Sequence, residues 1–143
     1  MFSESFSALP LATLIGNQYF VLHGGLFSND DITLDDVRKF DRHKEPQPGQ
    51  SGLMMEMLWT DPQDQEGRGP SKRGIGMQFG PDVTKRFCER NNIKAVIRSH
   101  EVRMDGYEVQ HDGRCITSMS CHVNCRCYLK SHVPINHLSV HVC

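Results

Sequence analysis

The apolar positions of the chain fall into short runs, which polar or glycine-containing segments separate. Two of these runs, residues 12–15 and 19–22, flank Gly16-Asn17, a dipeptide that favours a tight hairpin turn. The run at residues 95–97 is typical of a buried strand. The strands predicted on this basis comprise residues 12–15, 19–22, 95–97, 107–109 and 114–117, the last two forming a second hairpin.

A first helix is predicted to begin after Thr33. The hydroxyl of Thr33 can accept a hydrogen bond from a backbone N–H of the first turn, and two acidic residues follow in that turn, where they complement the helix dipole. Leu34, Val37 and Phe40 recur at helical spacing and would form its buried side.

A second helix is predicted from Pro81, because proline suits the first helical turn. Val83, Phe87 and Cys88 would form its apolar face, and Asn91-Asn92 can end it in a left-handed conformation. Residues 42–52 and 63–72 are rich in polar residues, Gly and Pro, and are predicted to be exposed loops. Strands that alternate with helices and hairpins indicate a mixed α/β fold.

Length and composition fit one soluble domain. The 143 residues are 38% hydrophobic and 23% charged, with a formal net charge of −1, so charge gives no reason to expect nucleic acid or a membrane as partner. The sequence contains no apolar run of membrane-spanning length and no pattern typical of a signal peptide. A cytoplasmic or nuclear location is therefore expected.

The composition changes abruptly near Thr117. The segment 118–143 has no acidic residue, although the chain has 17, and it holds four of the six cysteines and four of the eight histidines. We therefore expect two parts: residues 1–117 as the folded part, and residues 118–143 as a divergent, disordered Cys/His-rich tail.

Two histidines share one local pattern. His23 and His100 each lie just beyond a short apolar strand, where small or polar residues follow. A neutral imidazole held at a strand end can bind a transition metal, but it can equally be a hydrogen-bonded structural residue. The local pattern leaves both interpretations open.

Two further features near these strand ends also have two interpretations each. Gly24-Gly25 can allow a close approach of the backbone to a ligand, or can simply form a tight turn. The guanidinium of Arg73 can bind two phosphoryl oxygens at once, or can be a solvated surface group.

Taken together and in order, several motifs resemble the phosphoprotein phosphatase family of serine/threonine protein phosphatases. The resemblance covers residues 6–117, and within the family the segments around His23, Arg73 and Phe79 look most like the type five branch. The matching motifs are Leu9-Pro10-Leu11-Ala12, His23-Gly24-Gly25-Leu26, Leu58-Trp59-Thr60-Asp61-Pro62, Arg73-Gly74, Phe79-Gly80, Arg98-Ser99-His100-Glu101 and Asp105-Gly106-Tyr107-Glu108.

The resemblance implies the calcineurin-like metallophosphoesterase fold, here as a partial β-sandwich with flanking helices that is truncated at both ends. It implies two divalent metals, manganese or iron with zinc, and a phosphoprotein substrate. By resemblance His23 and His100 bind the same metal, with His100 also beside the substrate. Arg73 holds the substrate phosphate, Asp61 contacts residues that bind the metal or the phosphate without binding either itself, and Trp59 packs beneath the site.

Other motifs of that family have no counterpart in this sequence. By resemblance, the family's remaining metal ligands and its acid histidine belong to the first half of its domain, and none is found upstream of His23. Its second phosphate-binding arginine is not found here either. The helical-repeat targeting domain usual in the type five branch is also absent, so its partners are not carried over. With two ligands for one metal and none for the other, we expect the chain alone to be inactive.

Two alternatives remain beside the phosphatase interpretation. The chain could act as a non-catalytic phosphatase fragment that binds proteins. Alternatively, Cys121, Cys125, Cys127, His137 and His141 could form a small zinc-binding module, although the cysteine spacing departs from the usual zinc patterns. The tail could also be a product of altered splicing or of a frame shift.

Overall fold

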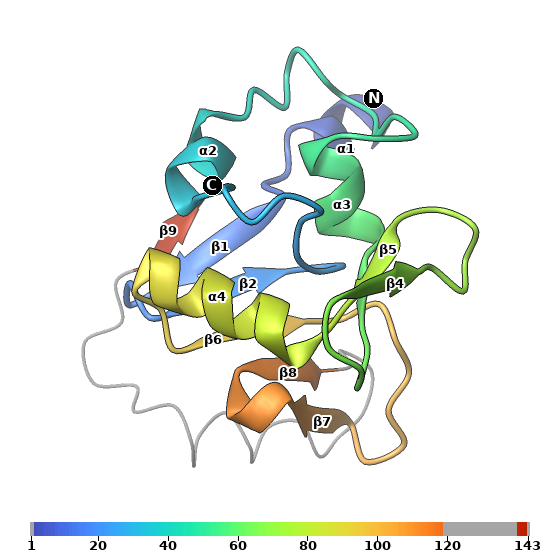
Figure 1. Ribbon diagram of the computed structural model, residues 1–143. Helices are drawn as coiled ribbons and strands as arrows, with labels where there is room; N and C mark the ends of the chain where they lie inside the picture. The colour runs from blue at the N-terminus through green and yellow to red at the C-terminus, as the bar shows by residue number, and fades with distance from the viewer. Residues whose placement is uncertain (1, 119–139, 143) are drawn as a thin grey trace.

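A mixed sheet of six strands forms the centre of the protein. The computed structural model describes residues 2–118 and 140–142 (Figure 1). Along the sheet the strand order is β7-β8-β6-β2-β1-β9, and a second sheet of three strands has the order β3-β5-β4. The strands of the large sheet are β1 (Ala12–Ile15), β2 (Tyr19–Leu22), β6 (Ala95–Arg98), β7 (Tyr107–Gln110), β8 (Cys115–Ser118) and β9 (Val140–Val142).

Both predicted hairpins are confirmed. β1 pairs antiparallel with β2 so that Leu14 lies opposite Phe20, and the intervening Gly16 and Asn17 both have positive φ angles, as a hairpin turn of this kind requires. β7 pairs antiparallel with β8 across a single 3₁₀ turn, His111–Gly113. The predicted strand at residues 95–97 is β6, which also includes Arg98.

The two predicted helices are confirmed, with one difference at an end. α2 (Leu34–Lys39) begins at Thr33, which forms a reciprocal capping box with Asp36. Phe40 was predicted on the buried side of this helix, but it is the half-buried C-cap residue, because the backbone turns extended there. α4 (Pro81–Asn91) ends at Asn92 in the left-handed conformation.

Three helices cover the same face of the large sheet. α3 (Leu53–Trp59) places Met57 in the core, α2 contributes Leu34, and α4 contributes Phe87. These side chains pack against β-strand residues such as Phe20 and Val96 in one hydrophobic cluster (Figure 1). The arrangement confirms the predicted mixed α/β class.

The small sheet was not predicted. It consists of β3 (Asp61–Pro62), β4 (Arg68–Pro70) and β5 (Met77–Phe79). The prediction of an uninterrupted loop over residues 63–72 is therefore wrong at β4, which pairs antiparallel with β5. Strands of two or three residues with Gly and Pro carry too little apolar alternation to be recognised from sequence.

Two further elements lie near the ends of the chain. α1 (Phe2–Ser7) is exposed along most of its length, and β9 pairs antiparallel with β1 at one edge of the large sheet. Residues 119–139 lie outside the described residues, so the expected disorder of the tail and its zinc alternative stay predictions. Within the described part of the chain, no helix is long and apolar enough to cross a membrane.

Candidate functional site

Parallel pairing of β2 with β6 brings the two predicted histidines together. The register pairs Val21 with Ile97, so both strands end at the same edge of the sheet. Beyond the ladder the pairing continues, because the Ser99 amide donates to the His23 carbonyl at 3.0 Å. His23 and His100, 77 positions apart in sequence, therefore lie side by side at the carboxyl ends of neighbouring strands.

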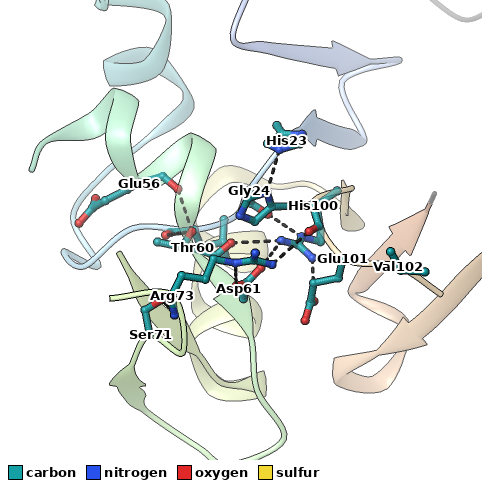
Figure 2. Close-up of polar contacts among 12 residues, drawn as sticks. His23, Gly24, Glu56, Thr60, Asp61, Ser71, Arg73, His100, Glu101 and Val102 are labelled. Atoms are coloured by element: carbon teal, nitrogen blue, oxygen red, sulfur yellow. Dashed lines mark hydrogen bonds and ion pairs between the residues drawn. The ribbon is translucent and has the colours of Figure 1, made fainter. Parts of the chain in front are cut away.

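The two imidazole rings are in direct contact (Figure 2). His23 Nε2 lies 2.8 Å from His100 Nδ1, and the ring centroids are 4.7 Å apart with an interplanar angle of 70°. The indole of Trp59, at the end of α3, packs edge-on against His100 with centroids 5.5 Å apart. The predicted neighbours His23, His100 and Trp59 thus form one cluster.

The backbone of His100 has an unusual conformation. Its φ angle is 73°, in the left-handed region that non-glycine residues rarely adopt. Such conformations cost about 1–3 kcal/mol and persist where surrounding contacts enforce them. One of these contacts is a hydrogen bond of 3.1 Å from Arg73 Nη2 to the His100 carbonyl.

Arg73 and Asp61 form an ion pair beside the histidines. Arg73 Nε donates to Asp61 Oδ2 at 2.7 Å, and the two side chains are 33% and 8% exposed. Burial alone would raise the pKa of Asp61, but the hydrogen bond and charge of Arg73, with those of Arg98, outweigh it and hold that pKa below its usual value. Asp61 is therefore a carboxylate that orients Arg73.

Both histidines are neutral at neutral pH. Burial, followed by the positive charge of Arg73, lowers the pKa of His100 to about 4. His23 is more exposed to solvent, yet partial burial and the charges of Arg98 and Arg73 still lower its pKa. A neutral imidazole keeps the nitrogen lone pair that binding to a metal requires.

The two glycines after His23 are needed for close packing rather than for a turn. A side chain at Gly24 would place its Cβ 2.5 Å from the Leu58 carbonyl carbon and 2.7 Å from the Trp59 nitrogen, both backbone atoms of α3. A Cβ at Gly25 would overlap the ring of Phe79. Neither glycine has a positive φ angle. The close approach that these glycines permit is to α3 and Phe79 of the chain itself, a packing role that neither predicted interpretation included.

Sequence reasoning missed the role of Arg98. Its side chain is the largest of those that are almost fully buried, and it lies between Asp61 and Glu101, with contacts of 2.7 Å and 2.8 Å. The available signal was a charged residue directly after the buried run Ala95–Val96–Ile97, since a buried charge requires partners.

The described residues fit part of a metal site. Two nitrogens that bind one ion at roughly 2.0–2.1 Å each lie about 3 Å apart, close to the spacing of His23 Nε2 and His100 Nδ1. Within residues 2–118 and 140–142, however, no group of three or more His, Cys, Asp or Glu residues could hold a metal. Nε2 of His100 is buried and has no hydrogen-bond partner in that part of the chain. The second ring nitrogen of a metal-bound histidine normally has such a partner.

Comparison with known proteins agrees with this fold. Residues 1–104 match the family model described as calcineurin-like phosphoesterase, and the chain belongs to this family. A solved structure of a serine/threonine phosphatase from Saccharomyces cerevisiae, described as similar to human phosphatase PP5, superimposes with a TM-score of 0.79 at 46% identity. That match covers 87% of this chain and 38% of the other.

Curated relatives of the chain are named as serine/threonine protein phosphatases. The chain is 75% identical over 125 residues to serine/threonine-protein phosphatase T of Aspergillus oryzae, and 57% identical over 120 residues to human serine/threonine-protein phosphatase 5. These matches cover 87% and 84% of this chain, but only 26% and 24% of the relatives. The predicted family and the partial metallophosphoesterase fold are thereby confirmed, and the chain spans about a quarter of the length of these relatives.

Proposed function

We propose that this chain contributes part of the active site of a metal-dependent phosphatase acting on phosphoserine and phosphothreonine in proteins. In this proposal His23 and His100 bind the same divalent ion, Arg73 binds the substrate phosphate, and Asp61 orients Arg73. The observation that carries it is the approach of His23 Nε2 to His100 Nδ1, at 2.8 Å, beside an arginine that bonds the His100 carbonyl.

The chemistry of each group supports this assignment. The bonds from Arg73 to Asp61 and to the His100 carbonyl use two of the five N–H donors of its guanidinium, and the others can bind a phosphoryl group. Asp61 fixes the plane of that guanidinium. A divalent ion held by the two imidazoles would lower the pKa of a bound water and withdraw charge from the phosphoryl oxygens.

We further propose that the 143-residue chain alone binds the ion weakly and hydrolyses nothing measurable. A catalytic metal usually has about three protein ligands, and the described residues offer two. The remaining ligands would have to come from residues other than those described.

A titration with Mn²⁺ tests the metal part of the proposal. Bound Mn²⁺ is paramagnetic and broadens the NMR signals of nearby ring protons, so the signals of His23 and His100 are expected to broaden before that of the exposed His43. His23→Ala is expected to protect His100 from broadening, whereas His43→Ala serves as the matched control. Equal broadening of all three rings would contradict the assignment.

Phosphate release from a phosphoserine peptide tests the catalytic part. With Mn²⁺ present, the purified chain is expected to release no more phosphate than buffer with Mn²⁺ does. Turnover that His100→Ala abolishes and His43→Ala leaves intact would show that the chain is an active enzyme by itself, and would overturn the proposed inactivity.

A further inference from the structure

The buried guanidinium of Arg98 contacts Asp61 and the residues that directly follow His23 and His100. We propose that Arg98 is a positioning residue that holds His23, His100 and Arg73 in a single arrangement. The inference concerns the geometry of these side chains in the metal-free protein, and its relevance to catalysis rests on the function proposed above.

Arg98 joins the segments that carry the two histidines. Its Nε donates to the carbonyl of Gly24 at 2.6 Å, and Gly24 directly follows His23. Its Nη1 donates to Oε2 of Glu101 at 2.8 Å, and Glu101 directly follows His100. The same planar group therefore contacts the residue immediately after each imidazole, just beyond the ends of β2 and β6, which are distant in sequence.

Arg98 also reaches the phosphate-binding arginine, through a carboxylate. Its Nη2 donates to Asp61 Oδ1 at 2.7 Å, while the other oxygen of Asp61 accepts from Arg73 Nε at 2.7 Å. Arg73 in turn donates to the His100 carbonyl at 3.1 Å. Together these bonds form a closed circuit. Arg73 contacts the His100 carbonyl and Arg98 contacts the side chain of the next residue, so two arginines hold the strained backbone of His100.

The geometry of these acceptors requires a guanidinium. Arg98 is 1% exposed and donates from Nε, Nη1 and Nη2, which point in different directions within one plane. A lysine ammonium is a single point of charge, and it cannot reach all of these acceptors at once. Arg98→Lys therefore keeps the positive charge that Asp61 needs but loses some of the bonds that position the histidines.

A second arginine offers a matched control. Arg68 Nε donates to the Phe27 carbonyl at 3.0 Å, and its Nη2 donates to Asp30 Oδ1 at 2.6 Å. These are the same two kinds of acceptor that Arg98 uses, but none of them is a site residue or directly adjoins one. Arg68→Lys therefore measures how the fold alone responds when an arginine loses its hydrogen bonds to one carbonyl and one carboxylate.

The test compares ring-to-ring contacts in the chelator-treated, metal-free 143-residue chain. In a two-dimensional NOE spectrum, the ring protons of His23 and His100 are expected to give cross-peaks, because the ring centroids are 4.7 Å apart. Arg98→Lys is expected to lose these cross-peaks while its circular dichroism stays that of a folded chain, and Arg68→Lys is expected to keep them. Persistence of the cross-peaks in folded Arg98→Lys, or their absence from the unsubstituted chain, would overturn the inference.

Glu101 decides the outcome if Arg98→Lys does not fold. Glu101→Ala removes one acceptor of Arg98 and leaves the buried ion pair with Asp61 in place, so the chain is expected to fold and the cross-peaks to weaken. Unchanged cross-peaks in Glu101→Ala, compared with the surface variant Glu89→Ala, would contradict the role of Arg98.

A Mn²⁺ titration of the same variants separates this inference from the proposed function. Loss of a group that orients metal ligands typically weakens metal binding roughly 10–100-fold, and that loss is expected for Arg98→Lys but not for Arg68→Lys. If Mn²⁺ does not select His23 and His100 even in the unsubstituted chain, the proposed metal site fails. The cross-peaks would still decide whether Arg98 positions the two rings.

Discussion

Gly24 shows how tightly the residues next to the site are packed. Its amide donates to the Met57 carbonyl at 2.7 Å, and its α-carbon faces the backbone of Leu58 and Trp59 at the end of α3. The chain that carries His23 therefore touches the helix that carries Trp59 with no room for a side chain. This contact sets the distance between the imidazole cluster and the indole beneath it.

Gly24→Ala is expected to destabilise the protein by about 1–3 kcal/mol or more, because the added methyl overlaps rigid backbone atoms. Urea unfolding measures the difference in free energy. Gly49→Ala is the control, since the nearest atom to its Cβ would be 3.5 Å away and its φ angle is not positive, and it is expected to change stability by less than about 0.5 kcal/mol. Equal stability of the two variants would show that α3 can move away from the strand end.

Among the secondary-structure elements, the β7–β8 hairpin pairs with β6 through β8, and one histidine in its turn also joins it to α4 and the small sheet. His111 is 8% exposed, and its Nε2–H donates to the Gln63 carbonyl at 2.9 Å. Because Nε2 carries the proton, Nδ1 accepts from the Thr84 hydroxyl of α4 at 2.8 Å. The ring also packs edge-on against Phe79. The neutral imidazole therefore joins the hairpin to α4 and to the small sheet.

The hydrogen bonds of neutral His111 predict a loss of stability in acid. Burial lowers the pKa of His111 below its usual value, although the Gln63 carbonyl and nearby aspartates oppose the shift. As the pH falls through about 6.5, the unfolded chain takes up a proton that the folded chain resists, so the free energy of unfolding decreases.

Urea midpoints at about pH 7.5 and pH 5.5 measure this effect. His111→Asn cannot titrate and tolerates the positive φ angle of that position, so it is expected to be less stable at both pH values but to show a smaller difference between them. The lowered pKa values of His23 and His100 also reduce stability in acid, equally in the unsubstituted chain and in His111→Asn. The difference between the two chains therefore reports His111. An equal pH difference in the two proteins would show that His111 does not sense acid.

The sequence predicted the elements whose signals are local. Gly16-Asn17 determined the first hairpin, and Thr33 marked the start of α2, because turn and cap preferences depend on a few neighbouring residues. The strand pairing that joins His23 to His100 could not be read from spacing, since parallel strands 77 positions apart are brought together by the intervening helices. The role of Arg98 was missed because its acceptors, two carbonyls and two carboxylates, come together only in the folded chain.

For the molecule as a whole, the large sheet connects segments from both ends of the chain. β1 lies between β2 and β9, with Leu14 opposite His141 on the outer side, so Val140–Val142 cover an edge that would otherwise offer unpaired N–H and C=O groups. The sequence-based division into residues 1–117 and 118–143 places these two strands in different parts. The candidate site, in contrast, lies at the ends of the central strands β2 and β6 (Figure 1).

A chain that lacks residues 140–143 tests how far the edge influences the centre. Amides of β1 that point toward β9 are expected to exchange hydrogen roughly tenfold faster, because a backbone hydrogen bond contributes a net ~0.5–1.5 kcal/mol. Amides of β7 and β8, at the other edge, serve as the internal control and are expected to exchange at unchanged rates.

The ring contacts of His23 and His100 are expected to persist, since Arg98 holds them from within the sheet and no bond of that circuit involves β9. Unchanged exchange in β1 would mean that β9 does not pair in solution, whereas loss of the ring contacts would mean that the site depends on the sheet edge as well as on Arg98.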